Sequence, residues 1–194
     1  MAEFNEIISS LADCVGPGHV KTDEGTLAAY SVDGMTPKAV VFPSNIEQVS
    51  GAVKVARSEG WAVLPWGGGT KINTGNPPGR LDLVVCLKRM NHMKDVDVAN
   101  LTLTVEAGVR FRDIQARLAT QEDRCYLPLE DLEKEADGIV CSDRSHSGCF
   151  LPLDPPFSEK ATIGGVMATN SSGPKSLYYN LPRDLILGAK IVDP

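Results

Sequence analysis

Residues 65–71, written PWGGGTK, directly follow the apolar residues 62–64 and contain three consecutive glycines. Glycine loses more backbone freedom on folding than any other residue, so an ordered run of three is destabilising unless something requires it. One reading is a tight turn that needs positive φ. The other is a concave surface of backbone N–H groups that holds a phosphate, with Thr70 adding a hydroxyl. Taken alone, the stretch favours both readings equally.

The spacing of this run excludes two common nucleotide motifs. The phosphate loop of nucleotide hydrolases needs G-x-x-x-x-G-K-[ST], which residues 65–71 do not contain. The dinucleotide fingerprint G-x-G-x-x-G opens a helix, whereas a polar loop follows Lys71 here.

A β-α-β pattern leads into the glycines. Residues 39–42 (AVVF) predict a buried strand, and residues 44–47 (SNIE) have the form of a capping box that opens a helix through Ser58. Residues 62–64 predict a second strand, which the crossover should make parallel to the first. The glycines then lie at the carboxyl end of a parallel strand, where open α/β sheets bind ligands.

The remaining elements follow from hydrophobic periodicity. Residues 4–14 and 111–118 each place apolar side chains on one helical face, and residues 22–30 contain a short helix candidate. Residues 121–150 are polar and irregular, and we expect an excursion over the surface. Strands are expected at three further places: 81–87, 101–106 and 185–192.

Length and composition limit the function classes. The 194 residues include 42% hydrophobic residues, enough for a buried core, and the net charge of −6 argues against a general nucleic-acid binder. No apolar run approaches the ~20 residues of a membrane span, and no signal peptide is readable. Five cysteines form an odd set, which favours a reducing, cytosolic-type compartment.

A second glycine-containing segment, residues 161–173 (ATIGGVMATNSSG), follows the stiff, extended residues 151–156 (LPLDPP). Its diglycine is flanked by small residues, hydroxyls and an asparagine, so it too is suited to backbone contact. Two such surfaces suit an extended ligand with a diphosphate. Close backbone packing is the alternative, and it explains both segments together less well.

Five motifs in this order resemble the FAD-binding domain of the vanillyl-alcohol oxidase/p-cresol methylhydroxylase (PCMH-type) flavoproteins. Within that family the likeness is to the glycolate oxidase FAD-binding subunit and to D-lactate dehydrogenase-like FAD-linked oxidases. The resemblance covers about residues 37–192. The motifs are 37–43 (PKAVVFP), 65–71 (PWGGGTK), 105–108 (VEAG), 161–165 (ATIGG) and 183–188 (RDLILG).

The resemblance implies an α+β fold of two α/β lobes that hold FAD between them. A small parallel β-α-β lobe would cover about residues 37–87, and a larger lobe with a mixed or antiparallel sheet about residues 95–194. An N-terminal helical segment, residues 1–36, would precede them, and residues 126–150 would be an insertion. Relative to the family, the domain is expected to be C-terminally incomplete and to lack the substrate domain.

The resemblance also implies three sets of FAD-contacting residues. The first would hold the diphosphate through backbone N–H groups and shape its approach: Pro65, Trp66, Gly67, Gly68, Gly69, Thr70 and Lys71. The second would flank the flavin half: Asp154, Thr162, Ile163, Gly164 and Gly165. The third matches another cofactor-contacting run: Thr169, Asn170, Ser171 and Ser172. Some relatives tether flavin through a histidine where this chain has Thr70, so we expect non-covalent binding.

The function that the resemblance implies is the FAD-binding part of an oxidoreductase. Flavin N5 would take a hydride from a 2-hydroxy acid such as glycolate or D-lactate, and electrons would pass to a partner subunit or quinone-linked carrier. No catalytic residue is assigned, and the chain alone is expected to be inactive. The alternatives are a non-catalytic nucleotide-binding module and a reductase of the cell-wall precursor type that uses NADPH and FAD.

Smaller constellations carry less weight. Cys141, His146 and Cys149, with Cys125 as a fourth ligand, fit no familiar zinc spacing, so we predict no metal site. His92 is expected to be a surface turn residue rather than a base. Two tyrosines and an arginine near the expected flavin region have packing as an equal explanation: Tyr178, Tyr179 and Arg183. We expect a cytoplasmic protein, free or peripheral to a membrane complex.

Overall fold

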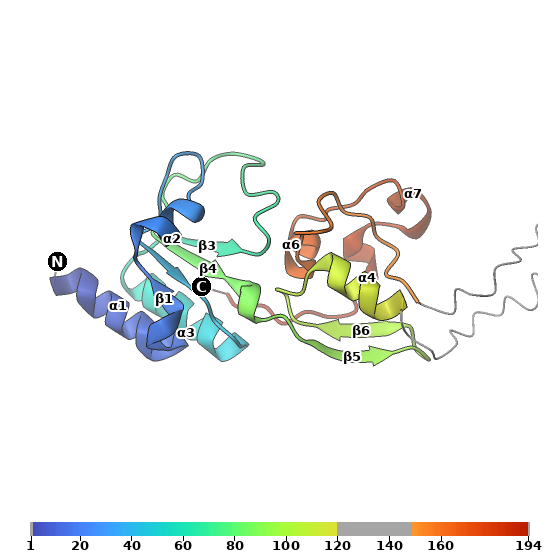
Figure 1. Cartoon of the computed structure of the whole chain (residues 1–194), viewed down its shortest axis with the longest axis horizontal. Coiled ribbons are helices and arrows are strands. Elements are labelled where there is room, and N and C mark those ends of the chain that lie inside the picture. The colour runs from blue at the N-terminus through green and yellow to red at the C-terminus, as the bar shows by residue number, and fades with distance from the viewer. Residues whose placement is uncertain (1, 120–148, 194) are drawn as a thin grey trace, which may run out of the picture.

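The computed structural model describes residues 2–119 and 149–193, and these form two groups of elements (Figure 1). The first group surrounds a four-stranded sheet: α1 (Ala2–Val15), β1 (Val20–Lys21), α2 (Glu24–Ala29), β2 (Ala39–Val41), α3 (Ile46–Ser58), β3 (Val63–Trp66) and β4 (Leu83–Cys86). The second group surrounds a hairpin: β5 (Met93–Asp97), β6 (Thr102–Val105), α4 (Phe111–Ala119), α6 (Ile163–Ala168) and α7 (Ser176–Tyr179). Short 3₁₀ helices cover Pro17–His19, Leu87–Arg89 and Pro182–Leu185.

The four-stranded sheet has the order β1-β2-β4-β3. β2 and β3 run parallel, as the β-α-β pattern predicts, but each pairs with β4, which lies between them. Val84 is accordingly the register partner of both Val40 and Leu64. β1 pairs antiparallel with β2, so the sheet is mixed. The carboxyl ends of β2, β4 and β3 therefore share one edge, and the glycines follow β3 at that edge.

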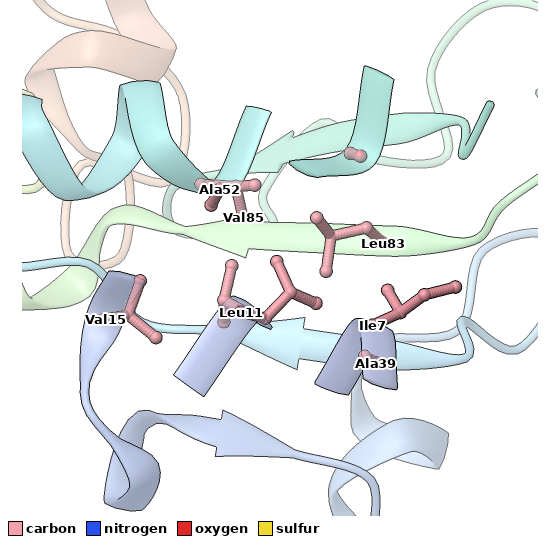
Figure 2. Close-up of a cluster of buried hydrophobic side chains, with 9 residues drawn as sticks. Ile7, Leu11, Val15, Ala39, Ala52, Leu83 and Val85 are labelled. Carbon is pink, nitrogen blue, oxygen red and sulfur yellow. The ribbon is translucent and has the colours of Figure 1, made fainter. Parts of the chain in front are cut away.

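Both faces of this sheet are buried, which explains the continuous apolar runs in β2 and β4. Figure 2 shows Ala39, Leu83 and Val85 facing Ile7, Leu11 and Val15 of α1 and Ala52 of α3. The alternate residues pack on the opposite face, in a cluster that includes Val40, Phe42, Val84 and Cys86. α1 and α3 thus cover the same face of the sheet and support the edge where the glycines begin.

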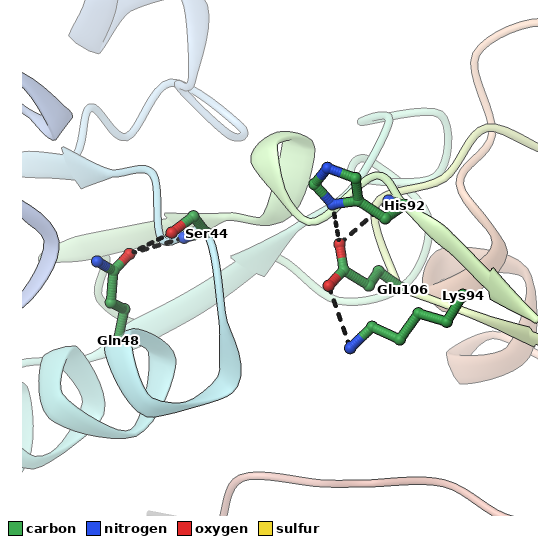
Figure 3. A network of polar contacts seen from close by, with 5 residues as sticks. All are labelled: Ser44, Gln48, His92, Lys94 and Glu106. Carbon is green, nitrogen blue, oxygen red and sulfur yellow. Dashed lines mark hydrogen bonds and ion pairs between the residues drawn. The ribbon is translucent and has the colours of Figure 1, made fainter.

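The start of α3 differs by one residue from the expected capping box. Asn45, not Ser44, is the N-cap, because its side-chain oxygen accepts the backbone N–H of Gln48 at 2.9 Å. The Gln48 side chain reaches back and accepts from both the N–H and the hydroxyl of Ser44, at 2.8 and 3.0 Å (Figure 3). Asparagine and serine cap helices about equally well, so neighbouring candidates leave the sequence ambiguous.

The second sheet is the antiparallel hairpin of β5 and β6. β6 was expected, but β5 was not, since its sequence MKDVD is mostly polar. Only Met93 and Val96 of β5 contact the core cluster of this region, and Lys94 and Asp95 are exposed. The fully buried part of that cluster comes from α4, α6 and the segments beside them: Val109, Phe111, Ile114, Leu118, Leu153, Ala161, Ile163 and Val166.

One expectation about the last third of the chain needs correction. The strand expected at residues 185–192 is wrong: within residues 186–193 the structure has no strand, and Leu187 and Ile191 are 86% and 83% exposed. An apolar run becomes a strand only by pairing with a neighbour, and none of the described strands pairs with it. The second glycine-containing segment, residues 161–173, contains the helix α6 (Ile163–Ala168), with Thr162 as its N-cap.

The expected insertion, residues 126–150, lies outside the described residues except for Cys149 and Phe150. Within residues 2–119 and 149–193, no helix is both long enough and apolar enough to cross a bilayer.

Candidate cofactor-binding site

The two glycine-containing segments are in contact. A Cβ atom on Gly67 would overlap the hydroxyl of Thr162, and one on Gly68 would overlap the backbone carbonyl of Lys160. On the second segment, a Cβ on Gly164 would lie 2.7 Å from that of Ala107. Side chains at Gly67 and Gly68 would therefore push the two segments apart, and one at Gly164 would push α6 away from Ala107.

Close backbone packing thus accounts for Gly67, Gly68 and Gly164, although it was the alternative reading of the sequence. Gly69 differs from these three because its φ is +68°, and an added Cβ would lie 2.8 Å from the indole of Trp66. The turn and the packing both require glycine here. Neither requirement uses the backbone N–H groups of the loop, which stay available for a ligand.

These N–H groups have few partners inside the protein. Within the part of the chain that the structure describes, the backbone N–H groups of Gly68, Gly69 and Thr70 donate to no carbonyl oxygen. Successive unpaired N–H groups in a turn form a favourable site for an anion. The loop therefore fits the diphosphate-binding role that the resemblance assigns to it.

A cavity of about 330 Å³ lies between the two segments. Twelve of the sixteen expected site residues line it: Pro65, Trp66, Gly67, Gly68, Gly69, Thr70, Lys71, Thr162, Gly164, Gly165, Thr169 and Ser171. Six further lining residues were not expected: Ile72, Leu87, Ala107, Ala161, Val166 and Ala168. Five of these six residues adjoin or lie within the quoted sequence segments, so their position in the sequence could have indicated them. Leu87 directly follows β4 at the same edge of the sheet as the glycines.

Four expected site residues lie outside this lining. Ile163 is 6% exposed and packs in the second core cluster. The carboxylate of Asp154 accepts the backbone N–H groups of Gly173 and Lys175 at 3.1–3.2 Å, and Asn170 accepts that of Arg183 at 3.1 Å. The fourth is Ser172. Asp154 and Asn170 therefore shape the chain beside the cavity.

Trp66 supports the glycine loop from one side. Its ring packs against that of Tyr30 in an edge-to-face pair, with centroids 4.9 Å apart, and Gly69 lies close to its indole. The Tyr30 hydroxyl donates to the Cys86 sulfur at 3.5 Å. Burial, together with this contact, raises the pKa of Tyr30, so the phenol keeps its proton at neutral pH.

A polar network holds the strand end that carries Ala107 (Figure 3). Glu106 accepts from the backbone N–H and ring nitrogen of His92, at 3.1 and 2.9 Å, and lies 3.3 Å from the ammonium of Lys94. Burial alone would raise the pKa of Glu106, but these hydrogen bonds and the Lys94 charge hold that pKa below its usual range. The adjacent Ala107 carbonyl accepts the N–H of Gly164 at 2.9 Å and so positions α6 against the cavity.

A second cavity, of about 890 Å³, adjoins the same contact and shares four lining residues with the first: Trp66, Gly67, Gly68 and Thr162. Its other walls carry exposed charged side chains such as Lys88, Arg110 and Lys160. None of the other expected site residues lines it. The smaller cavity is therefore the candidate site.

The minor constellations do not add to this site. Cys125, Cys141 and His146 lie outside the described residues, and among those described no group of three possible ligands is placed to hold a metal. His92 is an exposed residue directly before β5. Tyr178, Tyr179 and Arg183 do not line the cavity, and Tyr178 is 83% exposed.

Curated proteins are similar to this chain over almost its whole length. The chain is similar to the glycolate oxidase subunit GlcD of Bacillus subtilis, with 26% identity over 96% of this chain and 35% of that protein. It is also similar to D-2-hydroxyglutarate dehydrogenase of Stutzerimonas stutzeri, with 28% identity over 96% of this chain and 36% of that protein. The chain therefore spans about a third of the length of these curated relatives.

Solved structures share the fold. An alkyldihydroxyacetonephosphate synthase structure matches 94% of this chain and 35% of its own, with a TM-score of 0.69 and 21% identity. A p-cresol methylhydroxylase structure with bound substrate matches 89% of this chain and 30% of its own, with a TM-score of 0.61 and 20% identity. The expected PCMH-type fold is confirmed.

A family model described as FAD binding domain matches residues 37–131 and 143–194, more than half of the chain. The match includes both glycine-containing segments that line the cavity. The chain belongs to the FAD binding domain family.

Proposed function

We propose that the smaller cavity binds FAD without a covalent link. The diphosphate would lie along the backbone N–H groups of residues 67–71, opposite Thr162, Gly164 and Gly165. The observation that carries this proposal is the contact between two glycine-containing segments distant in sequence, which share one cavity and leave loop N–H groups unpaired. Thr70 supplies a hydroxyl but no strong nucleophile, which supports a non-covalent complex.

Each part of the site has a separate task in this proposal. The glycine loop binds the anionic bridge, Trp66 and Tyr30 hold the loop in place, and the Glu106 network orients α6. The apolar lining residues, such as Leu87 and Val166, exclude water from the ring systems of the ligand. When bound, the flavin supplies a redox centre that accepts a hydride, and the protein supplies its position and surroundings.

For the whole protein we propose a flavin-dependent oxidoreductase that acts on a small 2-hydroxy acid. Relatives named glycolate oxidase subunit, D-2-hydroxyglutarate dehydrogenase and D-lactate dehydrogenase support this substrate class. We further propose a cytoplasmic location and an electron-accepting partner subunit. The division into residues 1–36, a lobe of about 37–87 and a lobe of about 95–194 is part of the same proposal.

The alternative for the whole protein is a non-catalytic FAD-binding module. In both readings we expect the residues described here to bind the cofactor. The two readings differ only in what the whole protein does with bound FAD.

FAD titration into the full 194-residue chain tests the binding proposal. We expect quenching of tryptophan fluorescence and a flavin absorbance band near about 450 nm that stays with the protein on gel filtration. Acid precipitation should release all of the flavin into the supernatant, because no covalent link holds it. A chain that neither carries nor takes up FAD would refute the proposal. Bleaching of the bound flavin by glycolate or D-lactate, measured on a longer protein that contains this domain, would separate the oxidoreductase from the module.

A further inference from the structure

The hydroxyl of Ser171 is buried without a partner. Ser171 is 4% exposed, and within residues 2–119 and 149–193 its Oγ is the one buried side-chain N or O atom that makes no hydrogen bond. An unpaired buried hydroxyl is destabilising, so native proteins rarely keep one without a use. Ser171 lines the smaller cavity, so a ligand there is a natural partner for the hydroxyl.

The backbone on both sides of Ser171 is held firmly. Its own N–H donates to the Val166 carbonyl at 2.9 Å, which folds the chain back onto α6. Asn170, at φ 48°, accepts the N–H of Arg183, and Gly173 donates to Asp154.

The hydroxyl of nearby Thr169, which also lines the cavity, is already bonded to the Gly165 carbonyl at 2.8 Å. The Ser171 hydroxyl is therefore held in place and free to donate to a ligand, whereas the Thr169 hydroxyl is already used inside the protein.

The position of Ser171 indicates which part of FAD it meets. Thr162, at the amino end of α6, touches the glycine loop, whereas Ser171 follows the carboxyl end. The helix has six residues, so at 1.5 Å per residue it is about 9 Å long. A group that contacts Ser171 is thus up to about one helix length away from a diphosphate that lies beside Thr162. In FAD that distance leads to one of the two ring systems.

We propose that the Ser171 hydroxyl donates a hydrogen bond to a ring nitrogen or oxygen of bound FAD, and that this bond contributes to affinity. The proposal rests on FAD binding in the smaller cavity. Flavin and adenine both present such acceptors, so the chemistry is shared and the experiment identifies the ring. The same hydroxyl destabilises the protein without ligand and stabilises the complex.

Ser171→Ala in the full chain tests the proposal by two readouts of opposite sign. Without FAD, we expect the melting temperature to rise by about 2–4 °C, because an unpaired buried hydroxyl is removed. The Kd for FAD should increase about five- to tenfold, the loss of one hydrogen bond. Titrations with FMN and with ADP then show which half carries the acceptor: the affected ligand contains it.

Ser176→Ala is the matched control. Its hydroxyl donates to the Gly173 carbonyl at 2.7 Å, and it does not line the cavity. We expect a lower melting temperature and an unchanged Kd for FAD.

Two results would overturn the role of Ser171. One is a Ser171→Ala protein that binds FAD as tightly as the wild type. The other is a lower melting temperature for the ligand-free variant, which would mean that the hydroxyl is bonded inside the protein. A wild-type chain that does not bind FAD refutes the proposed function itself, so the two failures are distinguishable.

Discussion

The two ends of the parallel strands β2, β4 and β3 are built in opposite ways. At the amino ends, the carboxylate of Asp82 is 3% exposed and accepts the N–H of Ala62 at 2.8 Å. Lys38 and Arg80 reach the same carboxylate at 2.8 and 2.7 Å. Asp82, Lys38 and Ala62 directly precede the three strands, so one side chain joins all three.

At the carboxyl ends, some polar groups are left unpaired within the described residues. The glycine loop after β3 keeps unbonded N–H groups, Leu87 after β4 lines the cavity, and Ser171 adds an unpaired hydroxyl. A polar group without a partner can bind a ligand that satisfies it, and a buried one such as the Ser171 hydroxyl destabilises the protein without that ligand. The amino ends are thus joined by one fully paired carboxylate, whereas the carboxyl ends carry polar groups that are free to bind.

The largest effect is expected from a side chain placed between the two glycine-containing segments. Gly68→Ala places a Cβ against the Lys160 carbonyl, and backbone cannot move aside cheaply. We expect a loss of about 3 kcal/mol in the free energy of unfolding, measured by urea denaturation, and loss of FAD binding. Gly79→Ala is the control, because a Cβ there meets no atom within 4 Å. If both variants were equally stable, the packing role of Gly68 would be wrong.

Asp82→Asn tests the amino ends, with an expected loss of about 2 kcal/mol in stability and no change in the Kd for FAD. Burial alone would raise the pKa of Asp82, but Lys38, the Ala62 N–H and Arg80 hold that pKa below its usual value. A lowered pKa in the folded state stabilises above the unfolded-state pKa of about 4, and this contribution is lost as the pH falls.

The stability difference between wild type and Asp82→Asn should accordingly be largest near neutral pH and shrink below about pH 4. Urea denaturation at a series of pH values measures it. A difference that grew on acidification would contradict the assigned role of this carboxylate, and a change in FAD affinity would contradict the separation of the two ends.

The smallest effect on the fold is expected at Gly165, which lines the cavity. A Cβ there would meet only the Thr162 hydroxyl, at 3.3 Å, so the methyl group of Gly165→Ala would occupy the cavity. Alanine also favours the helix, so stability should stay the same or rise slightly. We expect FAD affinity to fall about fivefold, equivalent to about 1 kcal/mol. Unchanged affinity would place FAD away from this wall of the cavity.

Sequence and structure agree best for elements that a local apolar pattern specifies, and least for elements that depend on pairing with a distant segment. Apolar periodicity identified the helices α1, α3 and α4, which each bury one face, and continuous apolar runs identified the strands β2 and β4, which bury both. It missed β5, whose polar residues are held by pairing with β6, and it wrongly predicted a strand at residues 185–192, where no partner strand is described. The candidate site shows the same limit, because Ile72 and Leu87 carry no motif of their own.

The sequence by itself determined most of the helical and extended segments, and it showed which two segments have enough glycine to allow close contact. These are local properties, set by backbone sterics and by the spacing of apolar residues. Only the tertiary structure decided that Gly67, Gly68 and Gly164 allow segments to pack, that Gly69 turns the chain, and that Ser171 is left without a partner. Each of these depends on atoms brought together from distant parts of the chain, and sequence patterns do not encode such distances.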